Sequence, residues 1–346
     1  MSETPASPDE HTPTPAPAPD PAAARRPSHP VRRALLRLTF ISGVTLLGLL
    51  VLLWLGQRLL IYPGASMDHP TSRPLDAGWQ TWTLALDDVS AEAPDPAEPI
   101  ELIEPADTDV EPAGVPALLR PGDGATAQRP GPAVVFLHGN GEIISQWAPE
   151  LQWYTRHGVT VLIPEYRGYH RAAGRPSQRA IAADLRAFVD RLGQLDYVDA
   201  DRLIYHGRSM GGGFAAQLLA HRPPAALILA SSFTSFADAA ADLVHVPRFL
   251  VRDPLPVTPI LKNYPGPTLI LHGTQDRVVS VDHAHRNAAA AQQPTLVLYP
   301  DTGHNTMPRG HGDWSDIADF LAPRGLLPRP FDPGGIDDRV RALPAE

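Results

Sequence analysis

The sequence predicts an α/β protein with a mostly parallel central sheet and helices on both faces, preceded by one N-terminal transmembrane helix. From Ala133 onwards, short apolar runs alternate with segments long enough for helices. An uncharged apolar stretch spans Leu38–Gln57 near the N-terminus. A serine, Ser209, stands between two glycines where one apolar run ends and a helix-like segment begins.

The N-terminal region changes abruptly in composition. Residues 1–33 are rich in Pro, Ala, Ser and Thr and offer nothing to bury, so we expect a disordered tail. The apolar stretch that follows is bracketed by Arg37 and Arg58. As a helix it would rise about 30 Å, the thickness of a bilayer's hydrocarbon core. Residues 34–58 are therefore predicted to form a membrane anchor.

The flanks of this stretch favour a retained anchor over a cleaved signal peptide. Trp54 and Tyr62 stand where interfacial aromatic residues are expected. The residues that follow, RLLIYPG, contain no small-x-small cleavage site. The arginines that precede the stretch, with no acidic residue among them, are Arg25, Arg26, Arg32, Arg33 and Arg37. The positive-inside rule then predicts a cytoplasmic N-terminus, with the remainder on the outer, extracytoplasmic side.

The segment after the anchor is acidic. Trp79–Val89 alternates like a strand, and Val115–Pro121 is its expected partner. Between them, residues 90–114 form an acidic, Pro-rich insertion, which is more typical of a solvated loop than of a metal-binding tract. This segment carries much of the net charge of −9 and leaves the rest of the chain close to neutral. The sequence shows no basic face of the kind that would indicate nucleic-acid binding.

The region from Ala133 has the pattern of βα units around a buried parallel sheet. Continuous apolar runs are typical of strands that are covered on both faces. The predicted strands are 133–137, 159–164, 202–206, 225–230, 267–272 and 294–299. Between Ser231 and Pro265 there is room only for short helices, so any lid should be small. We expect one domain over 59–322 and a loose tail over 323–346.

The stretch YHGRSMGGGF demands tight backbone geometry. A strand that turns at once into a helix leaves one residue in a strained bend, and Gly207 and Gly211 remove side chains that would collide there. Ser209 is then exposed at the carboxyl edge of the sheet, where α/β folds bind ligands. The helix that begins at Met210 directs its free N–H groups to the same point. G-x-S-x-G in this context is a nucleophile elbow.

Taken together, the motifs resemble those of membrane-anchored α/β-hydrolase-fold serine hydrolases, in particular the small-lid group with serine-aminopeptidase-like members. They occur in that family's order and cover most of the chain. The matching segments are RLLIYPG, HGNG (138–141), PEYRGYHRAAGRPS (164–177), HGRSMGG (206–212), LHGTQDRVV (271–279) and DTGHN (301–305). One departure is His170, which stands where the family usually has glycine.

A serine needs a base, and the base needs an orienting acid. The expected base is His304, on a loop after the last strand, where Gly303 would let the loop pass close to the site; His311 is the alternative. The family order Ser…Asp…His points to Asp276 after the strand 267–272. Weaker alternatives for the acid are Asp301 and Asp282.

The oxyanion hole should use two backbone N–H groups, from Met210 and from Asn140 in the HGNG turn. His138 in the same turn is expected to be a hydrogen-bonded structural histidine. Tyr166 and Arg167 could either shape the pocket or cap the sheet.

No metal or cofactor is predicted. The chain has no cysteine, which excludes disulfides, thiol catalysis and Cys-based metal sites. No P-loop, dinucleotide fingerprint or H-E-x-x-H motif occurs. The histidine groups at His283–His285 and His311–Trp314 lack a convincing third ligand, so loop or helix-surface histidines are the favoured interpretation.

The sequence therefore predicts a membrane-tethered serine hydrolase that cleaves carboxylic esters or thioesters of small or lipid-like acyl substrates. Peptide hydrolysis, aminopeptidase-like, is the first alternative, because the same machinery cuts amides. A non-catalytic binding module at the membrane is the second. A binding module has no need for Ser209, Asp276 and His304 together, which argues against it.

Overall fold

The computed structural model describes residues 30–62, 75–76, 78–86, 114–307 and 311–329. Within it the chain forms two compact units that divide between Leu52 and Leu53, inside the first helix. Most of the predicted tail, residues 1–29, lies outside the described residues, as does nearly all of the predicted acidic insertion. The second unit therefore begins before the predicted domain start at residue 59, because the last turns of the helix belong to it.

The first helix, α1 (Pro30–Ile61), has 32 residues and exceeds the predicted anchor at both ends. Residues 30–33, predicted to be disordered, form its first turn, which proline tolerates because its missing N–H has no helical partner there. Val31–Leu59 is long and apolar enough, by length and composition, to cross a membrane. Its large apolar side chains are exposed.

Tyr62 corrects one expectation. Instead of standing at a membrane interface, its side chain is fully buried in the core of the second unit. Its ring packs edge-on against Tyr169, with 6.3 Å between the ring centroids. Trp54 remains partly exposed, at 42%. The first residue after α1 is thus part of the folded core.

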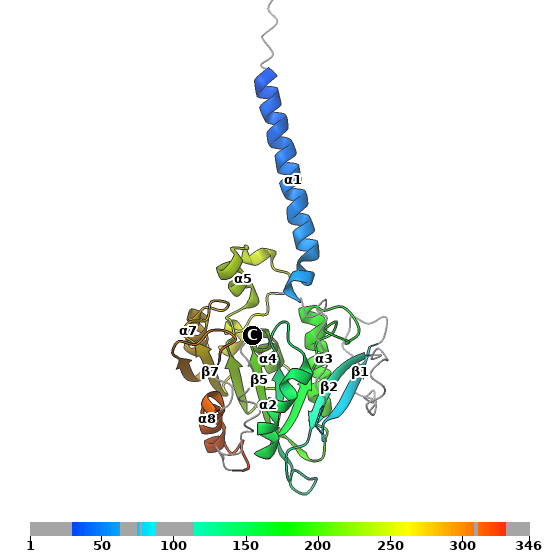
Figure 1. Ribbon diagram of the computed structural model, residues 1–346, viewed down its shortest axis with the longest axis vertical. Helices are drawn as coiled ribbons and strands as arrows, with labels where there is room; N and C mark the ends of the chain where they lie inside the picture. Colours follow the sequence, from blue (N-terminus) through cyan, green and yellow to red (C-terminus); the bar gives the residue numbers. More distant parts are fainter. Residues whose placement is uncertain (1–29, 63–74, 77, 87–113, 308–310, 330–346) are drawn as a thin grey trace, which may run out of the picture. The chain divides into compact units, whose positions relative to one another are not determined.

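An eight-stranded sheet organises this domain, in the order β1-β2-β4-β3-β5-β6-β7-β8 (Figure 1). The strands are β1 (Gln80–Ala85), β2 (Gly114–Arg120), β3 (Gly131–Leu137), β4 (Thr160–Pro164), β5 (Val198–Arg208), β6 (Ala226–Ala230), β7 (Pro267–Gly273) and β8 (Gln293–Tyr299). β2 is antiparallel to both β1 and β4, and all other pairs are parallel. The predicted mostly parallel sheet is confirmed, strand by strand.

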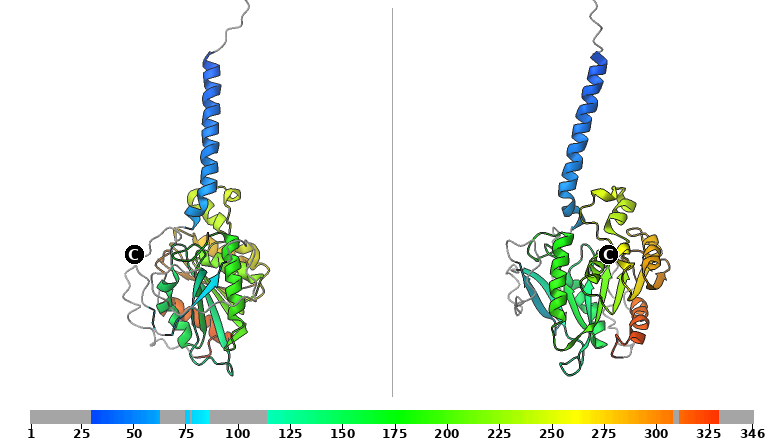
Figure 2. Two further views of the ribbon diagram at one scale, coloured as in Figure 1. Left: turned by 90° about the vertical axis from the view of Figure 1, so that its right-hand side faces the viewer. Right: turned by 180° about the vertical axis from the view of Figure 1, so that it is seen from behind.

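Helices cover both faces of the sheet, as predicted (Figure 2). The helices after α1 are α2 (Ile144–Arg156), α3 (Gln178–Leu192), α4 (Met210–Leu219), α5 (Phe236–Val244), η3 (Arg248–Leu250), α6 (Thr258–Leu261), α7 (Val281–Ala290), α8 (His311–Leu321) and η4 (Ala322–Arg324). Alternate residues of β3 enter opposite cores: Val135 packs with α3 and α4, whereas Phe136 packs with α2 and α8. Two buried faces explain why the strands read as continuous apolar runs.

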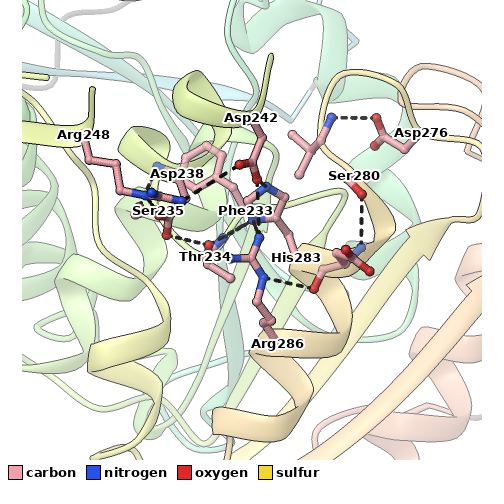
Figure 3. A network of polar contacts seen from close by, with 12 residues as sticks. Phe233, Thr234, Ser235, Asp238, Asp242, Arg248, Asp276, Ser280, His283 and Arg286 are labelled. Atoms are coloured by element: carbon pink, nitrogen blue, oxygen red, sulfur yellow. Dashed lines mark hydrogen bonds and ion pairs between the residues drawn. The ribbon is translucent and has the colours of Figure 1, made fainter. Parts of the chain in front are cut away.

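Only short helices fill the connection from β6 to β7, as expected. We refer to residues 236–261, which contain α5, η3 and α6, as the lid segment. Thr234, just before this segment, is fastened to α7 through His283, whose Nδ1 accepts hydrogen bonds from the Thr234 N–H at 3.2 Å and from Arg286 at 3.0 Å (Figure 3). This ring nitrogen is therefore unprotonated, and burial lowers the pKa of His283.

The prediction of a loose tail over residues 323–346 is wrong for its first residues. The chain continues from α8 into η4, and Gly325 then turns it with a φ of 69°. Leu326 and Leu327 are buried in the core beneath α2 and α8. Burying two leucines outweighs the turn-forming composition around them. Residues 330–346 lie outside the described residues.

Candidate active site

Ser209 is the single residue between β5 and α4, and its backbone is strained. Its φ of 51° and ψ of −116° lie in a region that residues with a Cβ rarely adopt. Two hydrogen bonds hold it there: the Ser209 N–H donates to the Ala230 carbonyl at 2.8 Å, and its own carbonyl accepts from the Gly212 N–H at 3.0 Å. The serine side chain is thereby fixed at the carboxyl edge of the sheet.

The glycines around Ser209 are required by close backbone contacts, as expected. A Cβ on Gly207 would lie 2.5 Å from the Gly211 carbonyl oxygen. A Cβ on Gly211 would lie 1.9 Å from the Leu137 carbonyl oxygen at the end of β3. At Gly303, by contrast, the nearest atom would be 3.5 Å away, an ordinary contact. The expectation that Gly303 is needed for close passage is therefore wrong.

Three side chains from separate loops form one hydrogen-bonded chain. Nε2 of His304 lies 3.0 Å from the Ser209 hydroxyl oxygen, and Nδ1 lies 2.7 Å from Oδ2 of Asp276. Because a carboxylate only accepts, Nδ1 carries the proton and Nε2 is free to accept from the hydroxyl. These loops follow β5, β7 and β8, so the parallel sheet brings the three residues to the same edge.

Asp276 lies in a site that stabilises its charge. Burial alone would raise the pKa of this carboxyl, but hydrogen bonds from His272 and His304 and from the Val279 N–H hold it well below its usual range. Its Oδ1 accepts from the N–H groups of Val278 and Val279 at 2.9 and 2.8 Å. The carboxylate therefore stays ionised and faces the histidine.

Both residues predicted for an oxyanion hole lie at this edge. Met210 is the first residue of α4, so its N–H has no partner within the helix. Asn140 follows β3, and its side chain is fixed from two sides. Its Nδ2 donates to the Ile61 carbonyl at 2.8 Å, and its Oδ1 accepts from the Tyr169 hydroxyl at 2.6 Å. The last turn of α1 thus positions the loop after β3.

Comparisons with known proteins agree with this fold. A family model of the α/β hydrolase fold matches residues 132–247. An uncharacterized protein of Mycobacterium tuberculosis, Rv2307c, is 36% identical over 215 residues, which are 58% of this chain and 76% of that protein. Est1E from Butyrivibrio proteoclasticus superposes with a TM-score of 0.50 at 19% identity, covering 61% of this chain and 94% of Est1E. Acetyl xylan esterase 1 from Thermoanaerobacterium superposes with a TM-score of 0.50 at 21% identity, covering 61% and 79%.

The chain belongs to the α/β-hydrolase family. The matched residues include the HGNG turn and the nucleophile elbow, whereas Asp276 and His304 lie beyond them. The two solved structures, both under 25% identical, show the shared fold.

The residues that the sequence offered as alternative acids or as an alternative base are not among the three of the hydrogen-bonded chain described above. Asp301 accepts a hydrogen bond from the Gln275 side chain at 2.8 Å, and Asp282 is exposed in the first turn of α7. His311 is the first residue of α8, and its side chain is outside the description. Among the described residues no group of three His, Asp or Glu side chains could hold a metal ion. His170 has a φ of 46°, the backbone conformation for which the family's glycine is suited.

The HGNG turn of this α/β hydrolase is supported by a buried ion pair. Nε2 of His138 lies 2.8 Å from Glu165, and Nδ1 lies 2.9 Å from the Gly139 carbonyl. Burial would lower the pKa of His138, but the carboxylate of Glu165 outweighs it and raises that pKa. Tyr166 donates to the His138 carbonyl at 2.7 Å, and Arg167 pairs with Asp184 of α3. These contacts assign Tyr166 and Arg167 to supporting the sheet edge.

Arg208 is a residue that sequence analysis missed. It is buried and forms an ion pair with Glu142 on the loop after β3. Its Nη2 also donates to the His304 carbonyl at 3.3 Å and to Asn305 at 3.1 Å. Arg208 therefore connects the Asn140 loop to the His304 loop. The sequence does contain a signal for this pair. An arginine stands next to the serine in an otherwise apolar elbow, and a glutamate directly follows HGNG.

Substituting Gly211 by alanine should destabilise the fold strongly. The new Cβ would overlap the Leu137 carbonyl, and overpacking of this kind costs about 1–3 kcal/mol or more. Gly303→Ala is the matched control and should leave the stability of the fold nearly unchanged. Urea denaturation of the detergent-solubilised chain would measure both. Equal midpoints for the two variants would contradict the close approach.

Replacing Arg208 by methionine should lower kcat by about 10- to 100-fold with little change in KM, because His304 and the Asn140 loop lose their shared brace. Removing one partner of a buried pair also costs about 3–5 kcal/mol of stability. Arg202→Met, on the same strand but paired with Asp199, is the control and should keep kcat. Steady-state kinetics on an acyl ester would decide, and an unchanged kcat for Arg208→Met would exclude the bracing role.

Asp276→Asn should remove a stabilising contribution that depends on pH. Because the folded pKa is below the usual 3.8, this contribution is full above that value. It is lost progressively as pH falls from there towards the lower folded pKa. The difference in unfolding free energy between wild type and variant should therefore shrink below about pH 4.

Denaturation midpoints of wild type and Asp276→Asn across pH would measure this difference. A gap for Asp276→Asn that stays constant down to the lowest accessible pH would refute the depressed pKa.

Proposed function

We propose that this chain is a serine hydrolase that works by acyl transfer through Ser209, His304 and Asp276. The observation that carries the proposal is the hydrogen-bonded chain from the serine hydroxyl to the Asp276 carboxylate, built on a strained elbow. A free serine hydroxyl is a poor nucleophile. Here the neutral Nε2 of His304 is in position to take its proton as attack on a carbonyl begins.

In the first step Ser209 Oγ bonds to the substrate carbonyl carbon and its proton moves to Nε2 of His304. The carbonyl oxygen becomes an oxyanion, which the N–H groups of Met210 and Asn140 stabilise. Nδ1 stays bonded to Asp276, which stabilises the imidazolium. His304 then gives its proton to the leaving group, and the acyl group remains on Ser209.

In the second step water replaces the leaving group. His304 takes a proton from the water, whose oxygen attacks the acyl carbon. The carboxylic acid leaves, and the proton returns to Ser209 Oγ. The free enzyme is restored without any cofactor.

Carboxylic esters or thioesters are the proposed substrates. The short lid segment suits the small-lid, serine-aminopeptidase-like group that the motifs resemble. Est1E and acetyl xylan esterase 1 share the fold, and the latter is named for an ester substrate. The alcohol of an ester or the thiol of a thioester is a better leaving group than the amine of an amide.

We further propose that α1 is retained as a membrane anchor, with the N-terminus cytoplasmic and the hydrolase domain outside. The arginines before the span support this orientation. Contacts of its last turns support retention, because a cleaved signal peptide contributes nothing to the mature fold. Arg58 pairs with Asp253 at 3.0 Å, and the Ile61 carbonyl accepts from Asn140.

Ser209→Ala should abolish labelling by a fluorophosphonate probe and lower turnover of p-nitrophenyl acyl esters by a factor on the order of 10⁴ to 10⁶. The reason is that Ser209 Oγ is the proposed nucleophile that forms the acyl-enzyme. Ser280→Ala, which removes a hydroxyl from the cap of α7, is the matched control and should label normally. Gel fluorescence after probe treatment is the measurement, and labelling that survives in Ser209→Ala would disprove the assignment.

A further inference from the structure

An apolar tip projects from the lid segment. We call residues 243–249, with the sequence LVHVPRF, the lid tip. Leu243 and Val244 are 54% and 61% exposed, and Phe249 is 85% exposed. Outside α1, no other large apolar side chain in the described part of the domain is as exposed as Phe249. Exposed large apolar side chains that adjoin one another mark interaction surfaces.

The polar side of α5 fixes the direction of this tip. Asp238 forms an ion pair with Arg248, and Asp242 lies 3.5 Å from Arg286 of α7 and 3.3 Å from Nε2 of His283 (Figure 3). The Asp242 contacts bind α5 to α7, and the Asp238 ion pair joins α5 to η3. Within the described part of the domain, the apolar side chains at the end of α5 stay largely exposed.

The residues that follow the tip are fastened to the end of α1. The Gln57 side chain donates to the Leu250 carbonyl at 2.9 Å and accepts from the Arg252 N–H at 2.7 Å. The Arg252 guanidinium lies 4.5 Å from the ring centroid of Trp54. Figures 1 and 2 show the lid segment beside these last turns of α1, which belong to the same compact unit.

If α1 spans a bilayer, these contacts fix the depth of the tip relative to the end of the span. Gln57 is the last residue of the apolar stretch and its side chain is strongly polar, so in a spanning helix it marks the headgroup level. Trp54 with a stacked arginine is typical of that interface. The Leu250 carbonyl is hydrogen-bonded to the Gln57 side chain, and Phe249 directly precedes Leu250 in the chain. A spanning α1 therefore brings the exposed apolar side chains to the lipid.

We propose that the lid tip inserts into the interface of the bilayer that α1 spans. The inference rests on the proposed anchor and deepens the proposed function, because the lid segment follows β6 beside Ser209. The Ser209 N–H donates to Ala230 at the end of β6, so the chain that leads from the serine to the lid tip is short, and the substrates would be acyl esters or thioesters resident in the bilayer.

The chain has no cysteine, so a single one can be introduced and labelled in the full-length protein. Phe249→Cys and Leu243→Cys would each carry the environment-sensitive fluorophore NBD. The protein would be reconstituted into vesicles of phosphatidylcholine and phosphatidylglycerol. We expect blue-shifted emission at both positions and strong quenching when doxyl-labelled lipids are included.

Two further positions make the result decisive. Ala127→Cys, exposed in the connection between β2 and β3, should be neither shifted nor quenched. Leu47→Cys, within α1, should be quenched if the helix spans the bilayer. Quenching at Leu47→Cys without quenching at Phe249→Cys would overturn the proposal.

A blue shift at Phe249→Cys without lipid quenching would also overturn it, because a protein surface rather than lipid would then cover the tip. Absence of quenching at Leu47→Cys would remove the anchor and the proposal together. Fluorophosphonate labelling of Ser209 would be unaffected by either result, so failure here is distinct from failure of the hydrolase assignment.

Discussion

The site depends on the close packing of α4 against the end of β3. The Gly211 backbone lies so near the Leu137 carbonyl that no side chain fits between them. This contact forces the chain to turn within one residue, which leaves Ser209 at a φ of 51°. The strain is compensated by hydrogen bonds to β6 and α4 rather than by the serine itself. A hydroxyl held by rigid elements needs little reorganisation before it reacts.

A second layer of buried charge holds the loops around that serine. Arg208, adjacent to Ser209, ties Glu142 on one side to the His304 loop on the other. On the opposite side of the same turn, His138 and Glu165 form a fully buried pair. Breaking such pairs is costly, because the remaining charge has no solvent to stabilise it. The loops at the sheet edge are thus fixed by electrostatics as well as by packing.

The sequence predicted what short-range patterns determine. Strands buried on both faces are continuous apolar runs, and the elbow is defined by five consecutive residues, so both were recognised. The pairing of Arg208 with Glu142 was missed because it joins residues 66 positions apart and requires β3 and β5 to be neighbours. Tyr62 was misplaced for a related reason: an aromatic residue after an apolar stretch has the same local signal whether lipid or a protein core covers it.

If α1 is the proposed membrane anchor, its end connects the depth of the protein in the membrane to the proposed active site. Ile61, whose carbonyl accepts a hydrogen bond from the Asn140 side chain, is four positions after Gln57, which is hydrogen-bonded to the lid segment. Four helical residues rise only about 6 Å. If Gln57 marks the headgroup level, the proposed oxyanion loop lies within roughly one helical turn of it. An acyl group would then need to leave the bilayer by only a short distance to reach Ser209, which favours substrates that stay partly embedded over those that arrive from solution.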